Sequence, residues 1–97
     1  MSVDYSSPDD LATAVLERCA LCDGQLSLPD EAVLACAREI DDAQDKRAWA
    51  IALTALANRL KAVPGAGPAT DRMLTLSAYA LEDRAVASIV HNYARKV

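Results

Sequence analysis

The sequence contains no phenylalanine, one tryptophan and three tyrosines, so aromatic side chains contribute little to its core. Only three glycines and four prolines occur among 97 residues, and they fall at expected element boundaries. Apolar residues nevertheless make up 53% of the chain, and many of them are alanine. Because alanine is the strongest helix former and its small side chain lets helices approach closely, the composition predicts an all-α bundle.

The sequence also lacks the features of membrane, secreted, disulfide-rich and nucleic-acid-binding proteins. No uncharged run is long enough to span a bilayer, and the acidic first ten residues lack the apolar segment of a secretion signal. Three cysteines cannot all pair within one chain, which disfavours a disulfide framework and indicates a reducing cytoplasm. An isoelectric point near 4.7 disfavours bulk nucleic-acid binding. We therefore expect a cytoplasmic protein that binds neither membranes nor nucleic acid.

Charge is segregated along the chain. Residues 1–45 contain eleven carboxylates and two arginines, whereas residues 46–97 contain eight cations and three carboxylates. The two halves therefore carry −9 and +5, which sum to the net charge of −4. A protein with one acidic and one basic half can attract a second copy of itself or a complementary partner.

Helix start and stop signals divide the chain into five helices and no strand, which we interpret as one domain over residues 1–97. Ser7-Pro8 followed by two aspartates has the residues of a helix start, and Gly24 those of a helix end. The segment 63–68 is the clearest loop. We expect a flexible tail at 1–7 and helices at about 8–23, 30–40, 44–62, 69–81 and 83–96, with a bend at Glu82-Asp83.

The third of these helices has the clearest apolar pattern. Ile51, Ala52 and Ala55 widen its apolar surface, so we expect more than one of its faces to be covered. Its main buried face is predicted by residues at four-, three- and four-residue spacing, namely Trp49, Leu53, Leu56 and Leu60.

A C-x-x-C pair formed by Cys19 and Cys22 is the most chemically suggestive motif. Together with Cys36 and His91 it has the ligand types of a tetrahedral zinc site. The competing interpretation, which we prefer, is that Cys19 and Cys22 continue the apolar stripe of the first helix as small buried hydrophobes. We therefore predict no metal ion and no cofactor, and we expect Cys19 and Cys36 to be buried and reduced.

A weak internal duplication lies over this pattern. Residues 47–60 align with 84–97 without a gap, and the acidic turn at Asp41-Asp42 aligns with Glu82-Asp83. With the segments 30–40, 47–48 and 53–57, the chain resembles HEAT-like, alanine-rich helical-hairpin repeats of bacterial signalling and conflict proteins. The resemblance implies a scaffold for protein contacts with no chemistry attached. Two hairpins are fewer than the three or so repeats a solenoid needs, so a closed bundle similar to small bacterial death-like domains is the alternative.

No catalytic signature accompanies these features, so we do not expect an enzyme. The leading prediction is a non-catalytic protein–protein interaction module that binds a partner, or itself, through complementary charge. An immunity- or inhibitor-type protein that covers a basic enzyme is the alternative, and a small Cys/His metal protein comes third. If the duplicated turns lie side by side, Arg84 is expected near Asp41 or Asp42. The residues expected at the interaction surface are Asp30, Asp41, Asp42, Arg47, Arg59, Lys61, Arg72 and Arg84.

Overall fold

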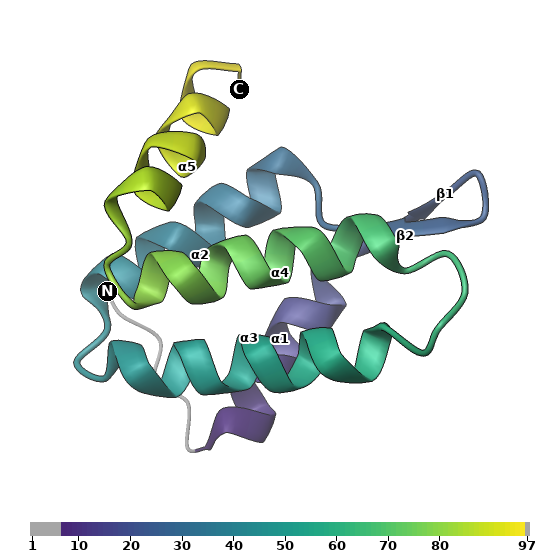
Figure 1. The fold of residues 1–97 in the computed structure, drawn as a ribbon, viewed down its shortest axis with the longest axis horizontal. Helices are drawn as coiled ribbons and strands as arrows, with labels where there is room; N and C mark the ends of the chain where they lie inside the picture. Colours follow the sequence, from purple (N-terminus) through teal and green to yellow (C-terminus); the bar gives the residue numbers. More distant parts are fainter. Residues whose placement is uncertain (1–6, 97) are drawn as a thin grey trace.

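Five helices and one short β-hairpin make up the structure, a computed structural model that describes residues 7–96 (Figure 1). The predicted all-α bundle of five helices is confirmed, but the expectation of no strand is wrong. The predicted tail at 1–7 lies outside the described residues except for Ser7, whose side chain accepts a hydrogen bond from the Asp10 amide (3.3 Å) and caps the first helix. The elements are α1 (Pro8–Glu17), β1 (Ala20–Cys22), β2 (Gln25–Ser27), α2 (Asp30–Asp42), α3 (Lys46–Leu60), α4 (Gly67–Ala80) and α5 (Arg84–Lys96).

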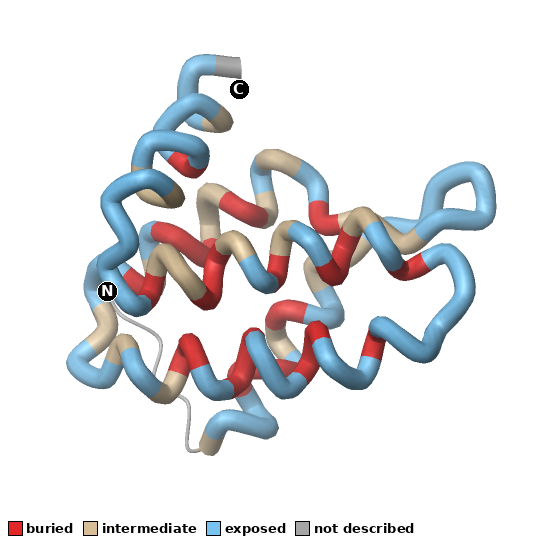
Figure 2. Tube along the Cα trace, viewed as in Figure 1, coloured by how far each residue is buried: buried red, intermediate tan, exposed pale blue. Residues whose placement is uncertain are grey.

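Helices α3 and α4 form the centre of the bundle. They lie side by side and antiparallel, α1 crosses behind α3, and α2 packs against α4 (Figure 1). All four residues of the predicted buried face of α3 are buried. The expectation that a second face of α3 is covered is wrong, because Ile51 and Ala55 are exposed and only Ala52 is buried. Helix α3 therefore buries one side and presents the other to solvent (Figure 2).

The first helix ends at Glu17, six residues earlier than predicted, and a hairpin follows it. Asp23 and Gly24 have φ values of +52° and +78°, and an Asp-Gly pair with both residues in the left-handed region forms the type I′ turn of a two-residue hairpin. The turn reverses the chain, so that Leu28, directly after β2, enters the core and is fully buried. Gly24 is therefore a hairpin residue and not the end of a helix.

The connection between α3 and α4 holds the hairpin against the bundle. The Leu26 amide donates a hydrogen bond to the Gly65 carbonyl (2.7 Å). Gly65 has a φ of +82°, and a Cβ atom placed on it would lie 2.6 Å from the carbonyl oxygen of Gly24. The loop predicted at 63–68 occupies 61–66 instead, because α4 begins at Gly67 with Pro68 in its first turn, where a missing N–H is tolerated.

The predicted bend at Glu82-Asp83 is confirmed, since it separates α4 from α5. Glu82 adopts a left-handed φ of +65°, and its amide and that of Asp83 bond to carbonyls in the last turn of α4 (3.0 and 3.1 Å), as in a Schellman cap. The Asp83 carboxylate then accepts bonds from two amides in the first turn of α5 (3.0 and 3.3 Å). Helix α5 stands off from the body (Figure 1), and Val90 is the one buried residue among its described side chains.

Candidate interaction surface

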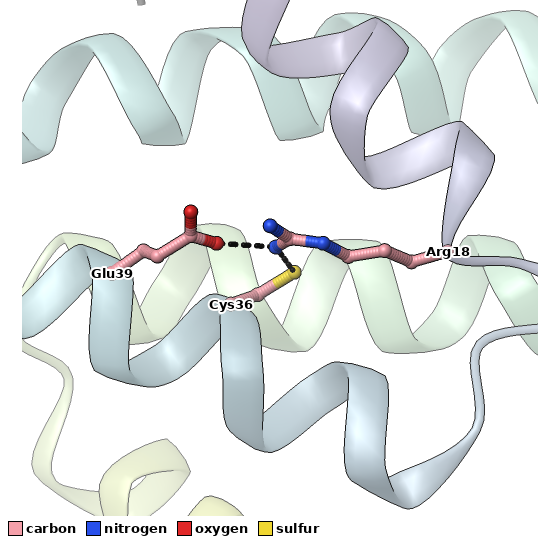
Figure 3. A network of polar contacts seen from close by, with 3 residues as sticks. All are labelled: Arg18, Cys36 and Glu39. Atoms are coloured by element: carbon pink, nitrogen blue, oxygen red, sulfur yellow. Dashed lines mark hydrogen bonds and ion pairs between the residues drawn. The ribbon is translucent and has the colours of Figure 1, made fainter. Parts of the chain in front are cut away.

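Arg18, just past the end of α1, connects that helix to α2 (Figure 3). One guanidinium nitrogen donates to Oε2 of Glu39 and also lies 3.2 Å from Sγ of Cys36. Both acceptors lie on one face of α2, because residues three apart are neighbours on a helix. The hydrogen bond to Glu39 raises the pKa of Arg18 above its ordinary value, although burial opposes the shift. The arrangement satisfies partly buried charges and ties two helices together.

The four candidate metal ligands do not form a site: within the described residues, no three His, Cys, Asp or Glu side chains gather to hold an ion. Cys36 is fully buried, and burial raises its thiol pKa despite the opposing hydrogen bond from Arg18. Burial also raises the pKa of Cys19, which is half-buried and not buried as expected. Cys22 is exposed on β1, since the chain has already left the helix, and His91 is exposed on α5.

Two of the predicted interaction residues, Asp30 and Arg72, pair with each other. Arg72 Nη1 lies 2.6 Å from Oδ1 of Asp30 and donates to the Leu28 carbonyl (2.7 Å). The guanidinium also lies over the Tyr93 ring, 4.8 Å from its centroid. The two charged side chains are 29% and 33% exposed. Arg72 therefore connects the start of α2 to α4 and α5, and this pair is a structural contact within the bundle.

The two acidic turns lie side by side, but their contacts differ from the expected ones. The Tyr79 hydroxyl donates to Oδ1 of Asp41 (2.8 Å), and Lys46 Nζ lies 3.8 Å from Oε1 of Glu82. Burial, together with the hydrogen bond to Asp41, raises the pKa of Tyr79 to about 12. Among the described residues no ion pair joins Arg84 to either aspartate of the first turn, so the expected contact is not formed.

Exposed cations lie along α3 and directly after it. This helix contains no carboxylate, and Arg47, Arg59 and the following Lys61 are exposed. The Arg59 side chain is 67% exposed, and its Nη2 lies 3.7 Å from Oδ1 of the exposed Asp9, an ion pair of a kind that adds little to stability. Ile51, 54% exposed, lies one turn after Arg47. The outer side of α3 is therefore a cationic surface with an apolar residue within it.

The last two predicted residues, Asp42 and Arg84, are exposed at helix ends. The roles of Arg18 and Glu39 and the exposure of Ile51 were not predicted from the sequence. Glu39 could have been found from its spacing, since it lies three residues after the buried Cys36. Arg18 has no comparable signal, because its contact depends on how α1 crosses α2.

Comparison of the chain with protein-family models, with curated protein sequences and with solved structures gives no match. In the part of the chain that the structure describes, each helix is too short or too polar to cross a lipid bilayer.

Proposed function

We propose that this protein is a non-catalytic protein–protein interaction module that uses the cations of α3 to bind an acidic surface on a partner. One observation carries the proposal: α3 has three exposed cations at or near its ends, no carboxylate of its own, and an exposed isoleucine between them. Exposed cations on one rigid helix that has no carboxylate of its own can steer and select an acidic partner.

Three carboxylates of the acidic half support the same assignment. Asp30 pairs with Arg72, Asp41 accepts a hydrogen bond from Tyr79, and Asp45 caps α3 by accepting from the Ala48 amide (3.1 Å). These groups have structural tasks, so the α3 surface is the better candidate for recognition. The proposal includes a cytoplasmic location, no cofactor, and an adaptor or assembly role in keeping with the resemblance to HEAT-like repeats.

The alternative function, an inhibitor that covers a basic enzyme, depends on acidic surface instead. Exposed carboxylates on α1, Asp10 and Glu17 among them, favour it. The two functions differ in the charge of the surface that the partner presents. An inhibitor of this type binds a basic surface through α1, whereas an adaptor binds an acidic surface through α3.

Affinity capture of native partners with paired charge reversals tests the proposal. Arg47→Glu with Arg59→Glu should abolish capture that the wild-type chain supports, because two of the three exposed cations of the α3 surface become anions. Arg38→Glu with Arg95→Glu changes the net charge equally at exposed positions on α2 and α5, and should leave capture intact. Capture should also weaken as the screening length falls from about 10 Å at 0.1 M salt to about 3 Å at 1 M.

Circular dichroism spectra and melting curves of both double variants show whether each remains folded. If the α3 reversal retains every partner, the proposed function is wrong. If Asp10→Lys with Glu17→Lys removes the partners instead, the inhibitor alternative replaces it.

A further inference from the structure

Three large apolar side chains are exposed along the two central helices. Ile51 on α3 is 54% exposed, and Leu74 and Leu81, on and just after α4, are 36% and 63% exposed. Side chains of this size at such exposure lose part of the free energy that full burial would supply. Grouped exposed apolar residues mark contact surfaces more often than single ones do.

Hydrogen bonds across the α3–α4 interface place these residues on one face. Ser77 donates to the Ala50 carbonyl (3.1 Å), so the Thr54 hydroxyl, 2.7 Å from Ser77 Oγ, is the donor in that second contact. Ile51 precedes Thr54 by three residues and therefore lies beside it on α3. We call the line of contact between the two helices at Thr54 and Ser77 the α3–α4 seam.

Leu74 and Leu81 flank the same seam from α4. Leu74 lies three residues before Ser77 and Leu81 four residues after it, so both are neighbours of Ser77 on the helix surface. The pair Lys46–Glu82 (3.8 Å) shows that the end of α4 lies beside the start of α3, which puts Leu81 near the amino end of α3. Ile51 therefore lies on the α3 side of the polar contact between Thr54 and Ser77, and Leu74 and Leu81 lie on its α4 side.

Cations mark the two ends of this seam. Arg47 and Lys61 lie seven residues before and seven after Thr54, so all three occupy one side of α3. At 1.5 Å per residue the two cations are about 21 Å apart along the helix. The carboxylate of α4, Asp71, lies on the side of Leu74 away from α3, and Glu82 already has Lys46 as its partner.

We propose that the α3–α4 seam binds an acidic amphipathic helix of a partner protein, an inference that rests on the proposed function and specifies the partner. A complementary helix needs about four turns to span the seam. Its apolar residues at i, i+3 or i+4, and i+7 contact Ile51, Leu74 and Leu81, and its carboxylates face Arg47 and Lys61.

A second copy of this chain fits the same face poorly. A two-fold contact brings the same surface of each copy together. In either helix orientation Arg47 then faces Arg47 or Lys61 of the other copy, and like charges in contact are unfavourable. The charges therefore favour a different, acidic partner.

Synthetic helical peptides test the inference directly by fluorescence anisotropy. The acidic probe has about 18 residues, about 27 Å as a helix, with Leu at i, i+3, i+7 and i+10 and Glu at most other positions. One control peptide has Lys in place of every Glu, and a second has the same composition with the Leu positions scrambled. The acidic probe should bind at least about tenfold more tightly than either control, a difference of about 1.4 kcal/mol.

Protein variants locate the site. Ile51→Ser and Leu81→Ser should each weaken binding of the acidic probe severalfold, whereas Leu21→Ser, which removes an apolar side chain 74% exposed on the hairpin, should not. Equal binding of the acidic and basic peptides, no binding of the acidic peptide, or an equal loss with Leu21→Ser would overturn the inference. Binding to anionic lipid vesicles without binding to the acidic peptide would replace it with a membrane contact.

Failure of this inference can be distinguished from failure of the proposed function. If native partners depend on Arg47 and Arg59 but the acidic peptide does not bind, the protein is an interaction module and the partner class is wrong. If native partners also survive the double reversal, both proposals fail.

Discussion

Replacement of Gly65 by alanine tests how the β-hairpin is held on the bundle. Gly65 has a φ of +82°, and an added Cβ would lie 2.6 Å from the carbonyl oxygen of Gly24. Its own carbonyl accepts the Leu26 amide at 2.7 Å. The obstacle to a side chain is backbone on the opposing segment, which cannot rotate away as a flexible side chain would.

The magnitude follows from these contacts. A left-handed conformation costs a residue with a Cβ about 1–2 kcal/mol. Separating the two backbones enough to relieve the contact strains the Leu26 hydrogen bond, which contributes about 0.5–1.5 kcal/mol. We therefore expect Gly65→Ala to lower the free energy of unfolding by about 1.5–3.5 kcal/mol, a large part of the roughly 5–15 kcal/mol available to a domain of this kind. The midpoint of thermal unfolding should fall by about 4–8 °C for each kcal/mol.

The other two glycines are matched controls. Gly24 also has a positive φ (+78°) but nothing within 4 Å of an added Cβ, so Gly24→Ala should cost only the conformational part, about 1–2 kcal/mol. Gly67 opens α4 with neither constraint, and Gly67→Ala should be neutral or stabilise by up to about 1 kcal/mol. Urea titrations followed by circular dichroism and by Trp49 fluorescence measure all three. If Gly24→Ala costs as much as Gly65→Ala, the close backbone approach has no energetic consequence and the reasoning is refuted.

Three further predictions concern the core and its polar contacts. Trp49→Ala should cost about 3–5 kcal/mol in chemical denaturation, because the side chain is buried, and a near-neutral result would place the ring at the surface. A soluble thiol reagent should modify Cys22 quickly and Cys36 slowly in the folded protein, since burial raises the pKa of Cys36 and keeps its thiol protonated. Arg18→Met should lower the free energy of unfolding by about 1–3 kcal/mol, because it leaves Glu39 partly buried without the guanidinium. Adding Glu39→Gln to the same chain should recover part of that loss. If the single and the double variant are both as stable as the wild-type chain, the pair contributes nothing to stability.

The elements that could be predicted from the sequence are those whose signals are local. The spacing of Trp49, Leu53, Leu56 and Leu60 identifies the face of α3 that becomes buried, because helical periodicity and burial agree there. The bend at Glu82-Asp83 also follows from local residues, since an aspartate caps the next helix.

The hairpin could not be chosen on local grounds alone. Asp23-Gly24 is a strong hairpin signal and Gly24 is equally a helix terminator, so the segment from Cys19 to Gly24 supports two structures. Which of the two structures forms depends on Gly65, which is 41 positions along the chain from Gly24. The Gly65 carbonyl accepts a hydrogen bond from the Leu26 amide. A docking contact between distant segments decides between two locally acceptable conformations, and the periodicity of one helix carries no information about it.

The charge pattern shows why the interaction surface was only partly predictable. Segregation along the chain suggests an acidic end and a basic end, yet folding brings Asp30 to Arg72 and Asp9 to Arg59, pairs drawn from opposite halves. Helix starts and turns use further carboxylates, as at Asp45 and Asp83, because the amides there need acceptors. Carboxylates have these structural uses at helix starts, whereas α3 contains no carboxylate of its own, and the acidic groups that approach its cations Lys46 and Arg59 come from other elements. The sequence therefore contains the information that α3 is cationic, but the burial that turns its other side inward is what leaves those cations, with Ile51, on the surface that we propose for a partner.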